Sequence, residues 1–195
     1  MRAPTKSIVL PILGAGLLLM LLGSATSTAA AAGPTTQSLQ TLGPVEVGKQ
    51  LPSWAGHTAS GQMVRSSDIL QPRRGEAPDA LVISFFGTWC EPCRTGLRVI
   101  QSVMDEHQGY KTVLIAKPPD LQKVRSFLKG LGVNQQVIPD EHQAISKRLG
   151  VGDAVPRTIV VGSDGVVRAI FGEEGGDFKQ VLIKALGAEG TALSQ

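Results

Sequence analysis

The sequence predicts an α/β domain in which helices cover both faces of a central mixed β-sheet. Three observations predict this fold class. Short apolar runs that suit strands alternate with segments whose apolar residues recur at helical spacing. A Cys-x-x-Cys motif lies where a buried strand passes into a helix, and an Asp-Gly turn joins two apolar runs near the C-terminus. With 195 residues, 42% of them apolar, we expect one domain and a targeting segment.

The N-terminus has the composition of an export signal. Arg2 and Lys6 are followed by an apolar run over residues 8–22 and by small residues over 24–32. The run is shorter than the ~20 residues that a membrane-spanning helix prefers. Residues 1–32 are therefore predicted to be a cleaved signal peptide or an uncleaved membrane anchor, and both alternatives stay open. In either case we expect the folded part in the periplasm or at the outer face of the cytoplasmic membrane.

The rest of the chain divides by composition. Residues 33–44, rich in Gly, Pro, Thr and Ser, are predicted to be a flexible linker, 45–187 the folded domain, and 188–195 a tail. The domain is expected to begin with a small β-hairpin that turns at residues 59–61. A single helical turn over residues 67–70 should follow it.

The Cys-x-x-Cys motif is predicted to lie at the N-terminus of a helix. Residues 80–86 form an apolar, β-branched run that reads as a buried strand, and helical spacing then continues to a stop at Gly109. Unpaired N–H groups and the helix dipole should favour the thiolate of Cys90. Cys93 lies one turn further on, within reach of a disulfide. Pro92 suits the first helical turn because its missing N–H has no partner there.

The later elements follow from apolar runs and the residues that bound them. Asp120 is a predicted N-cap, and Asp140 with the next three residues resembles a capping box for a helix that Gly150 stops. Asp177 is predicted to cap a final helix. The expected strands are 112–116, 136–138, 158–161 and 166–170, the last two joined by a turn over 162–165.

Composition excludes some classes of function. The net charge is only +3 and aromatic residues make up 4% of the chain, so we expect no nucleic-acid partner. The three histidines, His57, His107 and His142, are scattered, and a zinc site would need about two ligands besides the cysteines, so no metal is expected. No nicotinamide or flavin fingerprint is present, so no cofactor is expected either.

The motif residues resemble a known family. A strand, Trp-Cys-x-x-Cys and a helix, followed about 65 residues later by Val155-Pro156 before a hairpin, resemble the thioredoxin fold. The run 86–93, Phe-Gly-Thr-Trp-Cys-Glu-Pro-Cys, is similar to exported TlpA/ResA/CcmG-type thiol–disulfide oxidoreductases. The resemblance covers roughly residues 45–186, and it implies an N-terminal β-hairpin, an inserted helix and an export or anchor segment. Of the motif residues, Trp89 and Pro92 would support the cysteines.

The resemblance also implies residue roles. Cys90 would be the attacking thiolate, Cys93 the resolving thiol, and a Cys90–Cys93 disulfide the oxidised form. Pro156 would be a cis-proline that faces the disulfide, and Val155 would offer backbone hydrogen bonds to an extended partner. An X-Pro bond is the one place where a cis peptide is inexpensive, although an ordinary trans proline remains the alternative.

Three departures from the family pattern stand out. Ser84 occupies the position of thioredoxin's buried acid, and Gly96 that of a glutamate common in ResA-like proteins. The loop before the proline is one residue longer than usual, with Arg157 where a small residue is common. The first two departures remove proton acceptors for Cys93, so Glu91 is nominated instead. The alternative for Glu91 is a solvent-facing acid that offsets the helix dipole.

The predicted function is reduction of disulfides in exported partner proteins, with electrons from a membrane thiol reductant. Similar proteins act on apocytochrome c or copper-site assembly proteins, and nothing in the sequence selects between these partners. A thiol oxidase or isomerase of the same fold is one alternative, and a copper-binding carrier that uses Cys90, Cys93 and a distal histidine is another. A peroxidase is not favoured, because Thr88 is only two residues ahead of Cys90.

Overall fold

The structure is a computed structural model that describes residues 44–117, 120–172 and 176–187. The predicted leader (1–32), nearly all of the predicted linker and the predicted tail (188–195) lie outside the described residues. Within the described part of the chain, no helix combines the length and the apolar character needed to cross a membrane.

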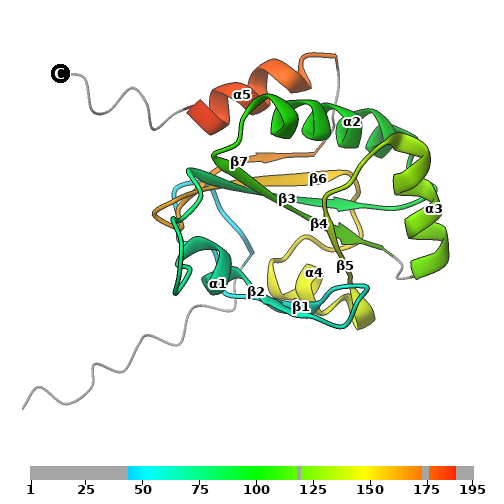
Figure 1. The fold of residues 1–195 in the computed structure, drawn as a ribbon, viewed down its shortest axis with the longest axis horizontal. Coiled ribbons are helices and arrows are strands. Elements are labelled where there is room, and N and C mark those ends of the chain that lie inside the picture. Colours follow the sequence, from blue (N-terminus) through cyan, green and yellow to red (C-terminus); the bar gives the residue numbers. More distant parts are fainter. Residues whose placement is uncertain (1–43, 118–119, 173–175, 188–195) are drawn as a thin grey trace, which may run out of the picture. The chain divides into compact units, whose positions relative to one another are not determined.

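A five-stranded mixed sheet forms the centre of the domain, as predicted (Figure 1). Its strands lie in the order β5–β4–β3–β6–β7, where β3, β4 and β5 are parallel and β6 and β7 are antiparallel to their neighbours. All seven residues of β3 are buried, because this central strand is covered on both faces. The bounds are β3 Ala80–Phe86, β4 Tyr110–Ala116, β5 Gln136–Pro139, β6 Arg157–Gly162 and β7 Val167–Phe171.

Helices cover both faces of the sheet (Figure 1). One face packs against α2 (Glu91–Glu106), α3 (Leu121–Leu131) and α5 (Phe178–Gly187). The other face packs against α4 (Ala144–Arg148), α1 (Ser66–Leu70) and the hairpin of β1 (Ala55–His57) and β2 (Met63–Arg65). Alternate residues of β3 therefore enter different cores: Ile83 and Phe85 face the hairpin side, and Val82 and Phe86 face α2.

The N-terminal hairpin and the helical turn after it are confirmed. β1 and β2 pair antiparallel, and the hairpin packs against β5, the edge strand of the main sheet. Gly56 permits this close approach, since a Cβ there would lie 2.7 Å from Ile138 Cγ2 and 3.0 Å from Ile145 Cδ1. The hairpin thus packs over the face of β5 that carries Ile138, where it closes one of the cores of the domain.

The predicted N-cap of α3 is confirmed, and a glycine caps its other end. The Asp120 carboxylate accepts a hydrogen bond from the Lys123 N–H at 3.1 Å, so Asp120 is the N-cap. Gly132 ends the helix in the left-handed conformation, with φ 69°. α3 and β5 form the inserted unit between β4 and α4 that the resemblance implies.

The prediction that a helix begins directly after Asp140 is wrong. A 3₁₀ turn, Glu141–Gln143, comes first, and α4 begins only at Ala144. His142 and Gln143 have φ values of 54° and 57°, which break the helix. The buried Asp140 carboxylate reaches past this break to accept the Ile145 and Ser146 N–H groups at 2.9 and 3.1 Å, and it also accepts the Ser146 hydroxyl.

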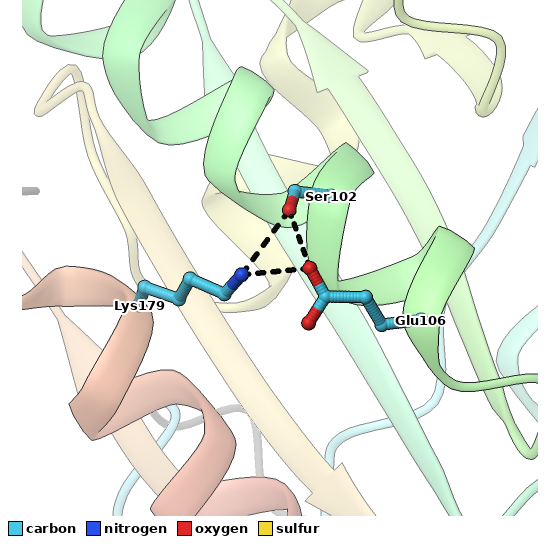
Figure 2. A network of polar contacts seen from close by, with 3 residues as sticks. All are labelled: Ser102, Glu106 and Lys179. Atoms are coloured by element: carbon cyan, nitrogen blue, oxygen red, sulfur yellow. Dashed lines mark hydrogen bonds and ion pairs between the residues drawn. The ribbon is translucent and has the colours of Figure 1, made fainter.

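A polar cluster joins the last turn of α2 to α5 (Figure 2). The Lys179 ammonium donates to Glu106 Oε1 at 2.7 Å and to Ser102 Oγ at 3.3 Å, and the Ser102 hydroxyl donates to Glu106 at 2.9 Å. The hydrogen bond from Lys179, with that from Ser102, lowers the pKa of Glu106. The cluster fixes α5 to the end of α2 that lies away from the cysteines.

Candidate active site

Cys90 and Cys93 lie where β3 passes into α2. Cys90 is the N-cap of α2, and its Sγ accepts a hydrogen bond from the Cys93 N–H at 3.2 Å. The two sulfurs form a disulfide of 2.07 Å, with the Cα atoms 5.3 Å apart. Cys90 keeps 7% of its surface exposed and Cys93 none, so of the pair only Cys90 offers any surface to an attacking group. Pro92 lies in the first turn, where a missing N–H leaves no bond unmade.

Trp89 offers apolar surface directly beside the disulfide. It is 62% exposed, although a large aromatic residue is usually mostly buried. Its ring lies against Gly87, where a Cβ would come within 2.7 Å of Trp89 Cη2 and Cζ2. Any side chain at position 87 would therefore displace the ring. Glycine at this position therefore lets the Trp89 ring present apolar surface next to Cys90.

The loop before β6 lies at the same end of the sheet as the disulfide. Arg157, the first residue of β6, pairs with Phe85 near the end of β3, so Pro156 lies beside the turn that carries Cys90. The Val155–Pro156 peptide bond is cis. Val155 packs against the core cluster that contains Cys90 and Cys93, which places this loop against the redox pair.

Glu91 does not approach the buried cysteine. Its side chain is 85% exposed, and its carboxylate pairs with the Arg94 guanidinium at 3.0 Å. Arg94 in turn lies over the ring of Phe127, with 4.7 Å between the guanidinium carbon and the ring centroid. The arrangement matches the alternative of a solvent-facing acid in the first helical turn and argues against Glu91 as the proton acceptor of Cys93. The i, i+3 spacing of Glu91 and Arg94 was the sequence signal for this pair.

A buried pair of hydroxyls occupies the position of the missing acid. Ser84 and Thr158 are opposite each other in the β3–β6 register, and the Thr158 hydroxyl donates to Ser84 Oγ at 3.0 Å. Both side chains are buried. The sequence pointed to Ser84, whereas its partner became apparent only from the strand register. Gly96 is buried in α2 and presents no carboxylate.

Lys117 is a buried cation that sequence reasoning missed. It follows β4 directly, is 7% exposed, and its ammonium donates a hydrogen bond to the Gly152 carbonyl. The ammonium also lies 5.8 Å from the centroid of the Phe85 ring. Burial lowers the pKa of Lys117, while the carboxylates of Asp140 and Asp153 act in the opposite direction. The only signal in the sequence is a lysine at the end of a buried strand.

An open cavity lies away from the cysteines. It has a volume of about 660 Å³ and is lined by residues at the start of β4, among them Tyr110 and Thr112, and by His107 at the end of α2. The cysteines lie at the opposite end of these two elements. Among the described residues, no group of three or more His, Cys, Asp or Glu side chains could hold a metal ion.

The sequence matches a family profile and curated relatives. The profile of the AhpC/TSA family matches residues 47–170. The thiol–disulfide oxidoreductase ResA of Bacillus anthracis is 26% identical over 133 residues, which cover 67% of this chain and 72% of the relative. The ResA protein of Bacillus subtilis is 25% identical over 131 residues, 66% of this chain and 69% of the relative.

Solved structures show the same fold. A secreted Mycobacterium tuberculosis disulfide oxidoreductase homologous to E. coli DsbE superposes with a TM-score of 0.58 at 18% identity, over 69% of this chain and 95% of that one. A thioredoxin-family thiol:disulfide interchange protein from Chlorobium tepidum gives a TM-score of 0.57 at 25% identity, over 73% and 99%. The chain belongs to the AhpC/TSA family and is a thiol–disulfide oxidoreductase with the thioredoxin fold.

Proposed function

We propose that this chain is an exported protein-disulfide reductase that works by dithiol exchange through Cys90 and Cys93. The observation that carries the proposal is the unequal burial of the pair: Cys90 retains some exposed surface at a helix N-terminus, and Cys93 lies fully buried one turn behind it. An accessible thiolate that attacks and a fully buried thiol that resolves need this difference in burial.

The exchange runs in two steps. The Cys90 thiolate attacks one sulfur of the partner disulfide, so a mixed disulfide forms and the other partner sulfur leaves as a thiolate. The Cys93 thiol then loses its proton and attacks Cys90 Sγ, which releases the second partner thiolate. The partner gains two electrons, and the Cys90–Cys93 pair becomes the disulfide. The N–H groups of the first turn of α2 favour the thiolate of Cys90 at the start of the cycle.

The partner is held by two features that flank the disulfide. The exposed Trp89 ring supplies apolar contact, and the backbone of Val155, ahead of cis-Pro156, binds an extended segment of the partner. Exported proteins with a disulfide or a thiol pair are the substrates, with apocytochrome c and copper-site assembly proteins as the candidates. A membrane thiol reductant supplies the electrons.

Export is supported by the composition of residues 1–32 and by the description of one structural relative as secreted. The segment acts as a cleaved signal peptide or as an anchor that holds the domain at the outer face of the cytoplasmic membrane. Residues 33–44 serve as the linker to the domain, 45–187.

The reduction potential of the Cys90–Cys93 pair in a defined thiol–disulfide buffer tests the direction of exchange. A reductant is expected to lie near about −250 mV or below. A value of roughly −120 to −180 mV would place the protein with oxidases and isomerases and would overturn the proposed direction.

The roles of the two cysteines are tested by trapping. Cys93→Ser should accumulate a mixed disulfide with a disulfide-bridged peptide, because the resolving step is lost while Cys90 still attacks. Cys90→Ser is the matched control and should form none. Adduct formation by Cys90→Ser at the rate of Cys93→Ser would overturn the assignment of the two roles. Peptide mass spectrometry under non-reducing conditions identifies the linked sulfur in each case.

A further inference from the structure

We infer that Lys117 is a positioning residue for disulfide exchange, whose ammonium group holds the Gly152 carbonyl and so fixes the loop that carries Val155 and cis-Pro156. The inference rests on the proposed function, in which that loop binds the partner. It adds to the site a residue that follows β4 directly and acts through the loop.

Backbone and side-chain contacts hold Lys117 close to the turn that joins β3 to Cys90. Its backbone N–H donates to the Phe86 carbonyl at 2.8 Å, which extends the β3–β4 pairing one residue beyond the last strand pair, Phe86 with Ala116. β3 ends at Phe86, and Cys90 follows four residues later. The Lys117 side chain lies over the Phe85 ring, on the face of the sheet opposite to that of Phe86. The position of the ammonium is therefore fixed at the end of the sheet where the cysteines lie.

The loop that Lys117 holds is also tied through Asp153, whose carboxylate accepts the Gln143 side-chain amide at 2.9 Å. Its first residues are tied to α4, because the Val151 N–H donates to the Ser146 carbonyl at 2.9 Å. From Gly152 to Ala154 the loop is exposed, and Gly152 has a φ of 62°, a backbone conformation that glycine adopts without strain. The hydrogen bond from Lys117 thus reaches the loop midway between its attachment to α4 and the start of β6.

A buried ammonium group at this position is unfavourable for stability. The two carboxylates that raise its pKa have hydrogen-bond partners of their own: Asp140 accepts N–H groups of α4, and Asp153 accepts the Gln143 side-chain amide at 2.9 Å. They act on Lys117 through space, and burial still lowers its pKa. The charge of Lys117 in turn offsets that of the buried Asp140 carboxylate, so removal of the lysine alone leaves this buried carboxylate without that compensation.

The comparison is between Lys117→Met and Lys111→Met in the full chain. Methionine keeps the length of the side chain and removes the donor, while Lys111 is an exposed lysine on the same strand, at its far end. Four quantities are measured: kcat and KM for a disulfide-bridged peptide, the rate of the reduced protein with 5,5′-dithiobis(2-nitrobenzoate), amide hydrogen exchange over residues 150–157, and the unfolding midpoint in urea. The small reagent reports on the Cys90 thiolate without using the loop.

Lys117→Met should raise KM for the peptide by about tenfold, the effect of losing one hydrogen bond to a charged group. Its kcat and its rate with the small disulfide should stay within about twofold of wild type. Exchange over 150–157 should accelerate, and the urea midpoint shows whether the substitution also lowers the global stability. Lys111→Met should leave all four quantities unchanged. If Lys117→Met does not fold, Lys117→Leu provides the same comparison.

Two results would overturn the inference. One is an unchanged peptide KM together with unchanged exchange over 150–157. The other is a parallel fall in the peptide and small-disulfide rates, which would mean that the substitution disturbs the cysteines themselves. Failure of the proposed function looks different, since the wild-type protein would then reduce no peptide disulfide. Hydrogen exchange would still decide whether Lys117 holds the loop.

Discussion

Replacement of Asp140 by asparagine tests whether one carboxylate organises the region behind the active loop. The buried side chain accepts three hydrogen bonds, from the Ile145 and Ser146 N–H groups and from the Ser146 hydroxyl. Asparagine has a single acceptor oxygen, so its NH₂ group must face at least one of these donors. The Ser146 carbonyl also accepts the Val151 N–H. A displacement of Ser146 would therefore also move the loop ahead of Pro156.

The magnitude follows from the groups left unpaired. A buried donor without a partner costs about 1–3 kcal/mol, and the surviving bonds weaken because they lose the charge. We expect Asp140→Asn to lower the free energy of unfolding by about 2–4 kcal/mol. For a domain of this size, that corresponds to a fall of roughly 5–12 °C in the thermal midpoint.

Urea unfolding followed by tryptophan fluorescence measures this change, since Trp54 is buried and loses its environment on unfolding. The matched control is Asp120→Asn, which alters the exposed N-cap of α3, whose side chain is 47% exposed. Asparagine caps helices about as well as aspartate, so the control should change the free energy by less than about 0.5 kcal/mol. Equal effects of the two substitutions would refute the reasoning.

Three further predictions concern single contacts. Glu91→Gln should leave the pH–rate profile for disulfide reduction unchanged, because the carboxylate faces solvent; a shift of the profile would restore it as a proton acceptor. The hydrogen bond from Lys179 lowers the pKa of Glu106, so ionised Glu106 contributes stability that is lost as the pH falls below its ordinary value of 4.5. Lys179→Met should therefore flatten the acid side of the stability–pH curve, which thermal scans in acidic buffers measure. Gly56→Ala should destabilise the domain by about 1–3 kcal/mol in urea unfolding, because its Cβ would lie 2.7 Å from Ile138 Cγ2; an unchanged midpoint would contradict this contact.

The parts of the fold that depend on local pattern could be predicted from the sequence. The strand over 80–86 and the helix that begins after Cys90 follow from apolar periodicity and from the proline in the first turn. The Asp120 cap and the Asp-Gly hairpin have equally local signals, and both are confirmed. The cis geometry before Pro156 could be expected only from the family resemblance, since an X-Pro pair by itself permits either isomer.

The parts that depend on contacts between distant segments could not be predicted. The capping-box pattern at Asp140 suggested a continuous helix, but tertiary structure holds His142 and Gln143 in left-handed conformations, which are uncommon for residues other than glycine. Lys117 reads as a solvated lysine, because its burial depends on a loop some 35 residues away in the chain. The exposure of Glu91 likewise depends on where the first turn of α2 faces.

The cluster of Ser102, Glu106 and Lys179 has a consequence for the redox cycle. α2 spans 16 residues, a length of about 24 Å, with Cys90 capping one end and this cluster anchoring the other. When the sulfur–sulfur bond opens, the rod-like helix stays clamped at its distal end and along its buried face. Oxidised and reduced molecules should therefore share the backbone of the distal part of α2, and any change linked to the redox state is expected in its first turn and the loops beside it.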